Sequence, residues 1–197
     1  MKNIAIVGTG PTGIYTFFSL LKFAEQMSIS IYEKEDEAGV GMPYNDDENS
    51  RIMLANIASI EIPPITSTYL DWLREQDETR LARYRVDKED LHDRQFLPRI
   101  LLGEYFRDQF LALVEAARRK GFAVEVHESS EVTDIEATTN GVKLWSEGKL
   151  DSKLFDLVVI ATGHVWPDDE KATRNYYPSP WSGLIEACLL YTSLSGL

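Results

Sequence analysis

The sequence predicts an α/β fold in which a parallel sheet is accompanied by a β-meander and interrupted by a helical insertion. Three observations predict it. A strand, a glycine turn, a helix and a second strand follow one another at the N-terminus; one long amphipathic helix lies in the middle of the chain; and a series of short β-type runs follows that helix. Strands that alternate with helices are typical of parallel sheets, because a crossover must return the chain to the same end of the sheet.

The first 33 residues form the first of these units. A short apolar run at 4–7 leads into Gly8-Thr9-Gly10-Pro11-Thr12-Gly13, and the apolar stretch at 14–23 is expected to form a helix. A second β-type run at 29–32 ends at Glu33. This order of elements, with an acid about 20 residues after the last glycine, is typical of a Rossmann-like unit that binds a dinucleotide.

Each part of the unit has a physical role. Gly8 permits a tight turn, Gly10 lets the backbone approach a pyrophosphate, and Gly13 allows the helix to pack closely on the strand. We expect the diphosphate at the helix N-terminus, where free N–H groups and the helix dipole favour negative charge. Glu33 is expected to accept hydrogen bonds from ribose hydroxyls, and its carboxylate disfavours a 2′-phosphate, so the unit favours FAD or NAD over NADP.

Loops and one short helix are predicted for the residues after this unit. Gly39 and Gly41 indicate either a backbone that passes close to another group, such as the diphosphate, or a flexible loop. Ser67 or Thr68 can cap a short helix, since residues 68–71 fit a capping pattern, and that helix is expected to run to about Gln76. The charged stretch at 77–93 predicts a surface excursion.

The clearest helix of the chain is expected to begin at Pro98. Proline is compatible with this position, since it is tolerated in the first turn of a helix. Its apolar side chains recur at helical spacing and predict a core-facing stripe rather than cofactor contacts: Leu102, Phe106, Phe110, Leu113 and Ala117. Basic residues at 118–120 favour the C-terminal end of the helix dipole, and Gly121 is predicted to cap the helix.

Four β-type runs follow the helix, at 122–126, 132–137, 142–145 and 155–160. Asn140-Gly141, between the second and third runs, is a hairpin signal. The fourth run is almost continuously apolar, which predicts a strand buried on both faces.

Composition argues against several classes of function. The 197 residues carry a net charge of −12, which disfavours a nucleic-acid surface, and no apolar run approaches the roughly 20 residues that span a bilayer. The first apolar run is too short for a signal peptide, so a cytoplasmic protein is expected. Cys188 is the only cysteine, which excludes an internal disulfide and a cysteine-based metal cluster, and the three histidines lack metal-binding spacing, so no metal site is expected.

Several motifs give the chain a resemblance to a group of flavoproteins. The last β-type run ends in Ala161-Thr162-Gly163, and this element together with the first glycine turn is similar to the FAD-binding domain of two-dinucleotide flavoproteins. GVGMPY at 39–44, MLAN at 53–56, and FLPR at 96–99 followed by Gly103-Glu104-Tyr105 narrow the resemblance to the enterobacterial FAD/NAD(P)-binding proteins. These share a nucleotide-binding domain with N-hydroxylating flavin monooxygenases of the amino-acid type. The similarity covers nearly the whole chain.

The resemblance implies FAD as the cofactor, NAD(P)H as the reductant of the full-length protein, and a flavin ring near Gly163. Together with the glycine turn, it gives these candidate cofactor-binding residues: Gly8, Gly10, Pro11, Thr12, Gly13, Glu33, Lys34, Gly41, Asn56, Arg99, Val132, Ala161, Thr162 and Gly163. No catalytic residue is assigned. The redox-active cysteine pair of the flavin disulfide reductases is missing from 34–60, which excludes that subclass.

Two of these positions have a second interpretation. Arg99 is expected either to pair with a phosphate or an anionic substrate or to form a surface salt bridge with Glu104 or Asp108. The resemblance favours the first interpretation, because the family places an arginine in this element. Asn56 is expected either to bond the edge of the flavin ring or to stabilise a turn.

The predicted organisation is a FAD-binding domain at 1–165 with an insertion at about 43–120, then a linker at 166–187. Residues 188–197 resemble an altered or truncated start of a second dinucleotide-binding motif, with Tyr191 in place of its first glycine. The chain is therefore expected to be a fragment of a longer protein, to bind FAD weakly and to turn over poorly by itself.

The predicted function is the FAD-binding part of an NAD(P)H-dependent flavoprotein oxidoreductase that acts on a small molecule. The resemblance implies amine N-monooxygenation as the reaction. Two other interpretations stay open at this point. One is a non-catalytic dinucleotide-binding module or redox sensor. The other is an NAD-only dehydrogenase, which the long insertion and the meander fit poorly.

Overall fold

The centre of the protein is a four-stranded parallel sheet. A computed structural model describes residues 1–46, 49–51 and 53–163. The strand order is β3-β2-β1-β7, and all three pairings are parallel. The strands are β1 (Lys2–Val7), β2 (Met27–Tyr32), β3 (Ala123–His127) and β7 (Leu157–Ile160). The α/β class predicted from the sequence is therefore confirmed.

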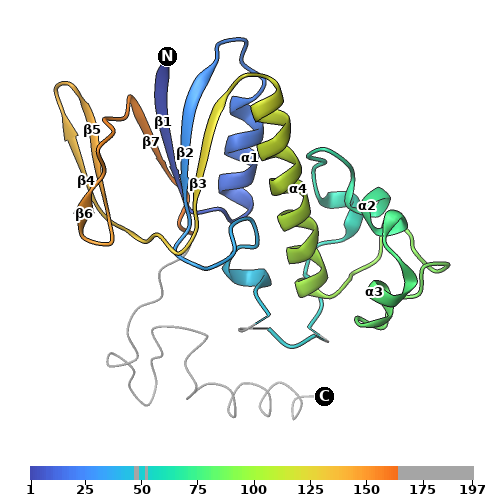
Figure 1. Ribbon diagram of the computed structural model, residues 1–197. Coiled ribbons are helices and arrows are strands. Elements are labelled where there is room, and N and C mark those ends of the chain that lie inside the picture. Colours follow the sequence, from blue (N-terminus) through green and yellow to red (C-terminus); the bar gives the residue numbers. More distant parts are fainter. Residues whose placement is uncertain (47–48, 52, 164–197) are drawn as a thin grey trace, which may run out of the picture. The chain divides into compact units, whose positions relative to one another are not determined.

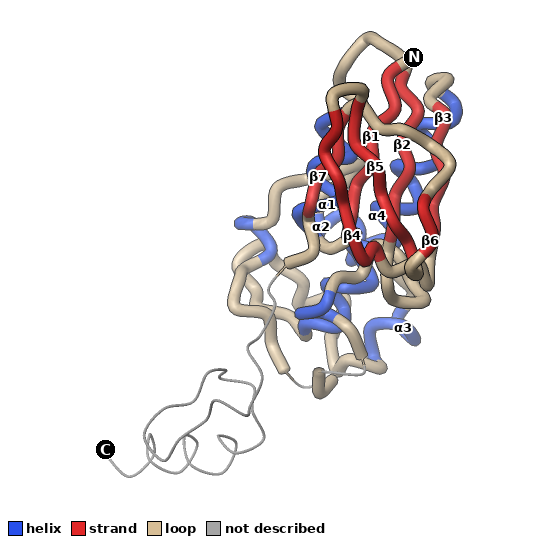
Figure 2. Tube along the Cα trace, turned by 90° about the vertical axis from the view of Figure 1, so that its left-hand side faces the viewer, coloured by secondary structure: helices blue, strands red, loops and turns tan. Residues whose placement is uncertain are grey.

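Two different layers cover the faces of this sheet (Figure 1). Helices α1 (Pro11–Leu20) and α4 (Arg99–Arg119) pack on one face and meet each other through Phe17 and Phe110, whose ring centroids are 6.2 Å apart. An antiparallel meander of β4 (Val132–Thr138), β5 (Gly141–Ser146) and β6 (Lys149–Leu150) lies on the other face. Figure 2 shows β4 and β5 in front of the parallel strands, with the helices behind them.

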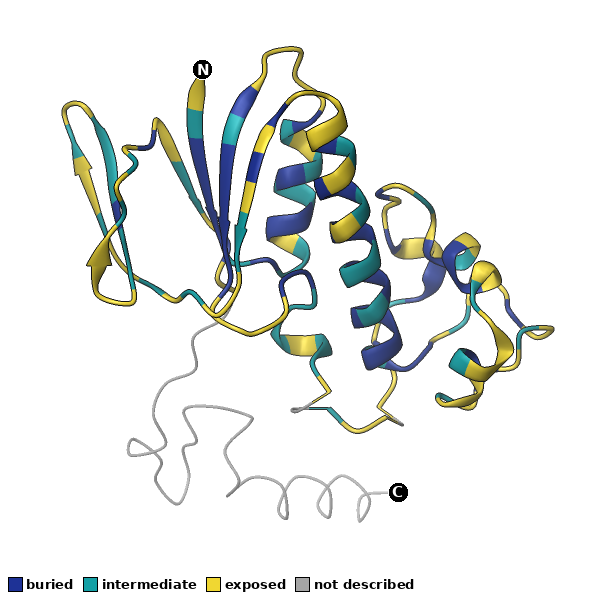
Figure 3. Cartoon of the chain, in the orientation of Figure 1, coloured by how far each residue is buried: buried dark blue, intermediate teal, exposed yellow. Residues whose placement is uncertain are grey.

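The central strand β1 is buried on both sides because its alternate residues serve different cores. Ile4 and Ile6 belong to the large cluster beneath the helices, whereas Ala5 and Val7 belong to a smaller cluster that includes Leu144 of the meander. Full burial of an isoleucine or valine side chain such as Ile4, Ile6 or Val7 stabilises the fold by roughly 1.5–3 kcal/mol. In Figure 3 the central strands β1 and β2 are largely dark blue, the colour of buried residues.

The long connection between β2 and β3 carries the rest of the helices. They are η1 (Met42–Tyr44), η2 (Ser59–Glu61), α2 (Tyr69–Glu75), α3 (Glu78–Ala82) and α4. The predicted cap of α2 is confirmed, since Thr68 Oγ1 accepts a hydrogen bond from the backbone N–H of Asp71 at 3.1 Å. At its other end α4 stops at Gly121 (φ 87°), whose N–H donates to Arg118 O at 3.0 Å. Because α4 packs on the sheet beside α1, it is the crossover helix between β2 and β3.

The strands after α4 divide between two sheets. β3 pairs with β2 in the parallel sheet. β4 and β5 form the predicted hairpin, with Thr138 opposite Gly141. The short strand β6 has no signal in the sequence, because two residues are too few to show an alternation. The meander is thus β4-β5-β6.

One expectation about burial is incomplete and another is wrong. Residues 77–93 are not only a surface excursion, because they contain α3, and Leu81, Val86 and Leu91 join the core as isolated apolar anchors in a charged stretch. The strand β7 is not buried on both faces: Leu157 is 48% exposed and Ile160 is 65% exposed. Within the described residues β7 has β1 as its one neighbour, so it forms the edge of the sheet.

The predicted linker at 166–187, Cys188 and the predicted second motif at 188–197 lie outside the described residues. Among the helices of the described part, none has the length and apolar character that crossing a membrane requires.

Candidate functional site

The candidate site lies where β1, β2 and β7 end, at the carboxyl edge of the parallel sheet (Figure 1). Gly8 follows β1 with a φ of 94°, a conformation that favours glycine, and its N–H donates to Tyr32 O at 2.8 Å. A Cβ atom on Gly8 would lie 2.5 Å from the carbonyl oxygen of Ala161. The structure thus brings Ala161 and Thr162 against the first glycine turn.

Gly13 is required by the packing of α1 on the same turn. A Cβ atom there would lie 2.1 Å from the carbonyl oxygen of Gly8 and 3.0 Å from its carbonyl carbon. Both contacts are with backbone, which has little freedom to move away. The close packing of helix on strand predicted for Gly13 is therefore present.

Gly10 differs from the other two glycines because the described chain does not need a glycine at this position. Its backbone is extended (φ −66°, ψ −178°), and a Cβ atom would meet only Gly41 Cα, at an ordinary contact distance of 3.6 Å. Gly10 is also the N-cap of α1, which has no side-chain cap and no acidic residue in its first turn. The N-terminal N–H groups of α1, at Thr12 and Gly13, are thus open to an anion.

The second glycine loop touches the first one. Gly41 has a φ of 81°, and a Cβ atom there would lie 2.9 Å from Gly10 Cα and 3.1 Å from Pro11 Cδ. Gly39 (φ 95°) similarly packs on the side chain of Phe110 in α4. The sequence left two interpretations of this loop, a close backbone approach or flexibility. The structure has the close approach, and the backbone of Gly41 approaches the first glycine turn.

Glu33 supports the glycine turn from the end of β2. Its side chain is buried (8% exposed), and Oε2 accepts hydrogen bonds from the Thr9 N–H at 3.0 Å and the Thr9 hydroxyl at 2.5 Å. The hydroxyl oxygen of Thr9 in turn accepts the N–H of Gly39 at 2.8 Å. Glu33 therefore holds the two glycine loops together through Thr9, a role that the sequence did not indicate, and the ribose contact expected of it stays a prediction.

We expect Thr9→Val to lower the free energy of unfolding by about 1–3 kcal/mol. The change keeps the shape of this buried residue, but it leaves the Gly39 N–H without its partner and removes one hydrogen bond from Glu33. Urea denaturation measures the loss. The control is Thr16→Val on α1, where the hydroxyl donates to a helix carbonyl; it should stay within about 0.5 kcal/mol of the original protein. Equal effects at both positions would contradict the role given to Thr9.

A salt bridge holds the second glycine loop from the other side. Arg107 of α4 donates both to Ala38 O and to Glu128 Oε1, the latter at 2.7 Å, and the same carboxylate oxygen accepts the Ala38 N–H at 2.9 Å. The hydrogen bond from the Ala38 backbone, assisted by the charge of Arg107, lowers the pKa of Glu128 below its ordinary value of 4.5. Arg107 and Glu128 are 21 residues apart, and no sequence pattern connects them.

The lowered pKa of Glu128 makes this clamp dependent on pH. A carboxylate whose pKa is lower in the folded state stabilises that state above pH 4.5, and the stabilisation is lost as the pH falls through the folded pKa. Glu128→Gln should therefore be less stable than the original protein at pH 7, and the difference should shrink below about pH 4.5. Unfolding by urea across pH 3–7 tests this, with Glu37→Gln, an exposed carboxylate on the same loop, as the control. A difference that stays constant with pH would contradict it.

The other candidate residues lie farther from the glycine turn. Lys34 is exposed and pairs with Glu35 at 3.2 Å. Val132, at the start of β4, packs against the smaller core cluster, and the loop before it joins the end of β2 because the Ser130 N–H donates to Glu33 O at 2.7 Å. Gly163 is exposed with a φ of 76°, and a Cβ atom there would have no atom of the described residues within 4 Å.

Arg99 and Asn56 lie on a second segment, in which Leu54 bridges to Pro98. The alternative salt bridge of Arg99 is wrong: Glu104 and Asp108 pair with Arg80, at 2.6 and 3.2 Å, and Arg99 Nε donates to Leu54 O at 3.3 Å. The first turns of α4, which begins at Arg99, pack on η1, since a Cβ atom on Gly103 would lie 2.7 Å from the carbonyl oxygen of Tyr44. Burial raises the pKa of Tyr44, and the charge of Arg99 opposes that rise. Asn56 is exposed.

The sequence of this chain matches the profile of the FAD-NAD(P)-binding family over residues 5–165. The chain therefore belongs to this family of dinucleotide-binding proteins.

Two curated relatives show how much of a longer protein this match covers. The chain is 66% identical to the uncharacterized protein YdhS of Escherichia coli and aligns over its whole length, but it covers only 38% of YdhS. It is 25% identical to the flavin-containing monooxygenase FMO GS-OX3 of Arabidopsis thaliana, with 91% of this chain and 42% of that protein aligned. The chain thus spans about two fifths of the length of these relatives.

Solved structures with a similar arrangement include the ornithine hydroxylase PvdA of Pseudomonas aeruginosa (16% identity, TM-score 0.43, 83% of this chain and 36% of that one). Another is the cadaverine monooxygenase DfoA of Erwinia amylovora, solved with FAD bound (15% identity, TM-score 0.42, 85% and 36%).

Proposed function

We propose that this chain is the FAD-binding part of an NAD(P)H-dependent flavoprotein oxidoreductase. The observation that carries the proposal is the contrast among the three glycines of the first turn. Gly8 and Gly13 are needed by the packing of the protein itself, whereas at Gly10 the chain leaves room for a Cβ atom beside the uncapped N-terminus of α1. The packing of the protein does not require glycine at position 10, and free N–H groups lie next to it. Both features fit a dinucleotide whose diphosphate approaches the backbone at this point.

The surrounding residues fit an extended dinucleotide. The N-terminal N–H groups of α1 would bind the diphosphate, while Gly41 closes the other side of the turn without a side chain in the way. The Glu33 carboxylate, at the end of β2, would disfavour a 2′-phosphate on the adenosine ribose. Ala161 and Thr162 bring the end of β7 to the same turn, so the flavin end of the ligand would run past Gly163. When bound, a flavin supplies the redox chemistry, and the residues named here supply position and charge.

For the whole protein we propose amine N-monooxygenation as the reaction. The support is the resemblance of the motifs at 39–44, 53–56 and 96–99 to proteins that share their domain with N-hydroxylating monooxygenases, together with the similarity to a flavin-containing monooxygenase. The alternative is a dinucleotide-binding module without catalysis. Oxidation of NAD(P)H by the longer protein, stimulated by an added amine, would separate the enzyme from the passive binder.

The test of cofactor binding uses the chain of 197 residues. The purified protein is denatured and the released small molecule is identified by its absorption spectrum; the refolded protein is then titrated separately with FAD, NAD and NADP. We expect a flavin in the released fraction, or uptake of FAD in preference to NADP. A protein that releases no dinucleotide and takes none up would overturn the proposal, and one that takes up NAD alone would replace FAD by NAD.

A further inference from the structure

A hollow lies on the insertion, and no residue of the glycine turn lines it. Its volume is about 410 Å³, and the residues that line it are Arg51, Leu54 and the segments 83–86 and 95–98. Three of the residues that line it are arginines, Arg51, Arg83 and Arg85. In a chain with a net charge of −12, three guanidinium groups around one hollow are a local concentration of positive charge.

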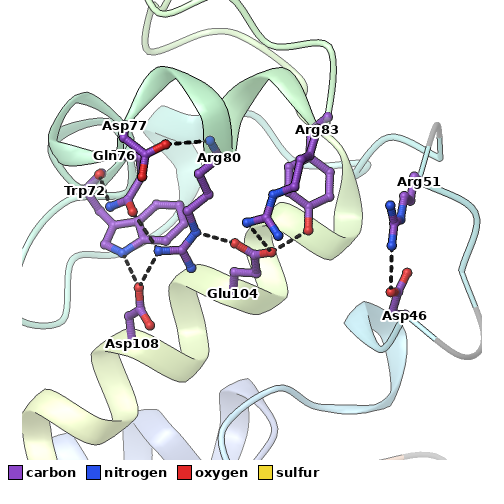
Figure 4. Close-up of polar contacts among 10 residues, drawn as sticks. Asp46, Arg51, Trp72, Gln76, Asp77, Arg80, Arg83, Glu104 and Asp108 are labelled. Atoms are coloured by element: carbon purple, nitrogen blue, oxygen red, sulfur yellow. Dashed lines mark hydrogen bonds and ion pairs between the residues drawn. The ribbon is translucent and has the colours of Figure 1, made fainter.

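Among the described residues, the charges of Arg51 and Arg83 are only weakly neutralised. The nearest Arg51–Asp46 distance is 3.5 Å and the nearest Arg83–Glu104 distance is 3.9 Å, both long for an ion pair. Figure 4 shows why Glu104 is a poor partner for Arg83: the same carboxylate already accepts a hydrogen bond from Arg80 at 2.6 Å. It also bonds the hydroxyl of Tyr84. Most donors of the Arg51 and Arg83 side chains therefore have no partner in the described part of the chain and can bind another anion.

Arg85 and Gln95 add unpaired polar groups to the same walls. Within the described residues, the side chain of Arg85 forms no hydrogen bond or ion pair, and its backbone has a φ of 56°, a conformation in which glycine is the usual residue. The side-chain oxygen of Gln95 is buried and has no hydrogen-bond partner in the described structure. An amide in this situation can turn its NH₂ group towards an incoming anion.

The remaining wall of the hollow is apolar. Leu54 and Phe96 line it and are 52% and 51% exposed, although side chains of this size are usually buried in a core. A ligand with an apolar body would cover them, while a small inorganic anion would leave them in water. The guanidinium fork matches the two oxygens of a carboxylate and of a phosphate ester equally well.

We propose that the Arg51–Arg83–Arg85 hollow binds an organic oxyanion, a carboxylate or a phosphate monoester, that carries an apolar group. The guanidinium groups bind the oxyanion, and Leu54 and Phe96 contact the apolar group. This proposal does not rest on the flavin site, because no residue of either glycine loop lines the hollow. The hollow nevertheless shares Leu54 and Pro98 with the segment that carries Arg99, so a ligand here lies beside one of the candidate cofactor-binding residues.

Isothermal titration of the 197-residue chain at low salt tests the proposal with four probes: 3-phenylpropionate, phenyl phosphate, the neutral 3-phenylpropionamide, and inorganic phosphate. At least one of the two amphipathic anions should bind at least about tenfold more tightly than both the amide and inorganic phosphate, and the stronger of the two identifies the oxyanion. Binding should weaken as salt is added, since the attraction is between charges. Equal affinity for the amide, or no binding of either organic anion, would overturn the proposal.

Variants of the hollow then locate the site. Arg83→Gln and Arg85→Asn should each weaken binding of the preferred probe at least about tenfold, because each removes a charged donor. Asparagine is chosen at 85 because it tolerates the left-handed backbone. The matched control is Arg94→Gln, an exposed arginine in the neighbouring loop that does not line the hollow, and it should bind as the original does. Circular dichroism confirms folding of each variant, and undiminished binding by both hollow variants would overturn the proposal.

Discussion

Gly13→Ala should destabilise the protein by about 3 kcal/mol or more, although alanine is normally the better helix former. In an open helix the same change stabilises by roughly 0.5–1 kcal/mol, because alanine loses less backbone entropy on folding. Here the new Cβ atom would lie 2.1 Å from the carbonyl oxygen of Gly8, so α1 must move away from the turn or the turn must distort. Overpacking of this kind typically costs about 1–3 kcal/mol and more where backbone must shift. The loss is large against the roughly 5–15 kcal/mol that stabilise a typical domain.

Urea denaturation at pH 7 measures this effect, and Gly10→Ala is the matched control. Gly10 is three residues away in the same turn, but its Cβ atom would meet only Gly41 Cα at 3.6 Å. The control should therefore change the free energy of unfolding by no more than about 0.5 kcal/mol. If Gly13→Ala were as stable as Gly10→Ala, the packing of α1 on the glycine turn described here would be wrong.

The second large effect concerns the ligand rather than the fold. Gly10→Ala should weaken the binding of FAD by at least about 100-fold, or ~2.8 kcal/mol, because the Cβ atom occupies the space that the diphosphate needs. Titration of the refolded chain with FAD, followed by flavin fluorescence, measures the affinity. Together with the stability measurement, this one variant separates binding from folding.

The control for the ligand effect is Gly148→Ala, on the meander hairpin, where a Cβ atom has nothing within 4 Å. It should leave the affinity for FAD unchanged, although its φ of 75° carries a conformational cost of about 1 kcal/mol. An unchanged FAD affinity in Gly10→Ala would place the diphosphate elsewhere and would remove the main support for the proposed function.

Much of the fold could be predicted because its signals are local. The cap at Thr68, the stop at Gly121 and the hairpin signalled by Asn140-Gly141 each depend on a few neighbouring residues, and all three are present. The loop of the hairpin is Thr139-Asn140, one residue before the signal, because Gly141 already pairs with Thr138. The stripe of the long helix was also predictable, since its side chains repeat with the period of the helix. The predictions about burial were weaker, because burial depends on what lies beside an element. The apolar run at 155–160 cannot show by itself that β7 lies at an edge of the described sheet.

The candidate site could likewise be predicted only in part. The three glycines of the first turn and Glu33 could be identified from their spacing, but their different roles could not. The need for glycine at Gly8 comes from Ala161, which is far away in the chain, and that at Gly41 comes from Gly10. The supports of the loop at Ala38 were missed altogether, because Arg107 and Glu128 meet only after α4 and β3 have packed on the sheet.

The amino-acid sequence alone determined the α/β class, the N-terminal dinucleotide-binding unit and the ends of α2 and α4, because these follow from hydrophobic period, glycine spacing and capping between near neighbours. Only the tertiary structure decided which glycines the protein needs for itself, what Glu33 holds, and where three arginines gather beside exposed apolar side chains. These features depend on distances between residues far apart in the chain, and such distances exist only once the sheet, the helices and the meander have packed together.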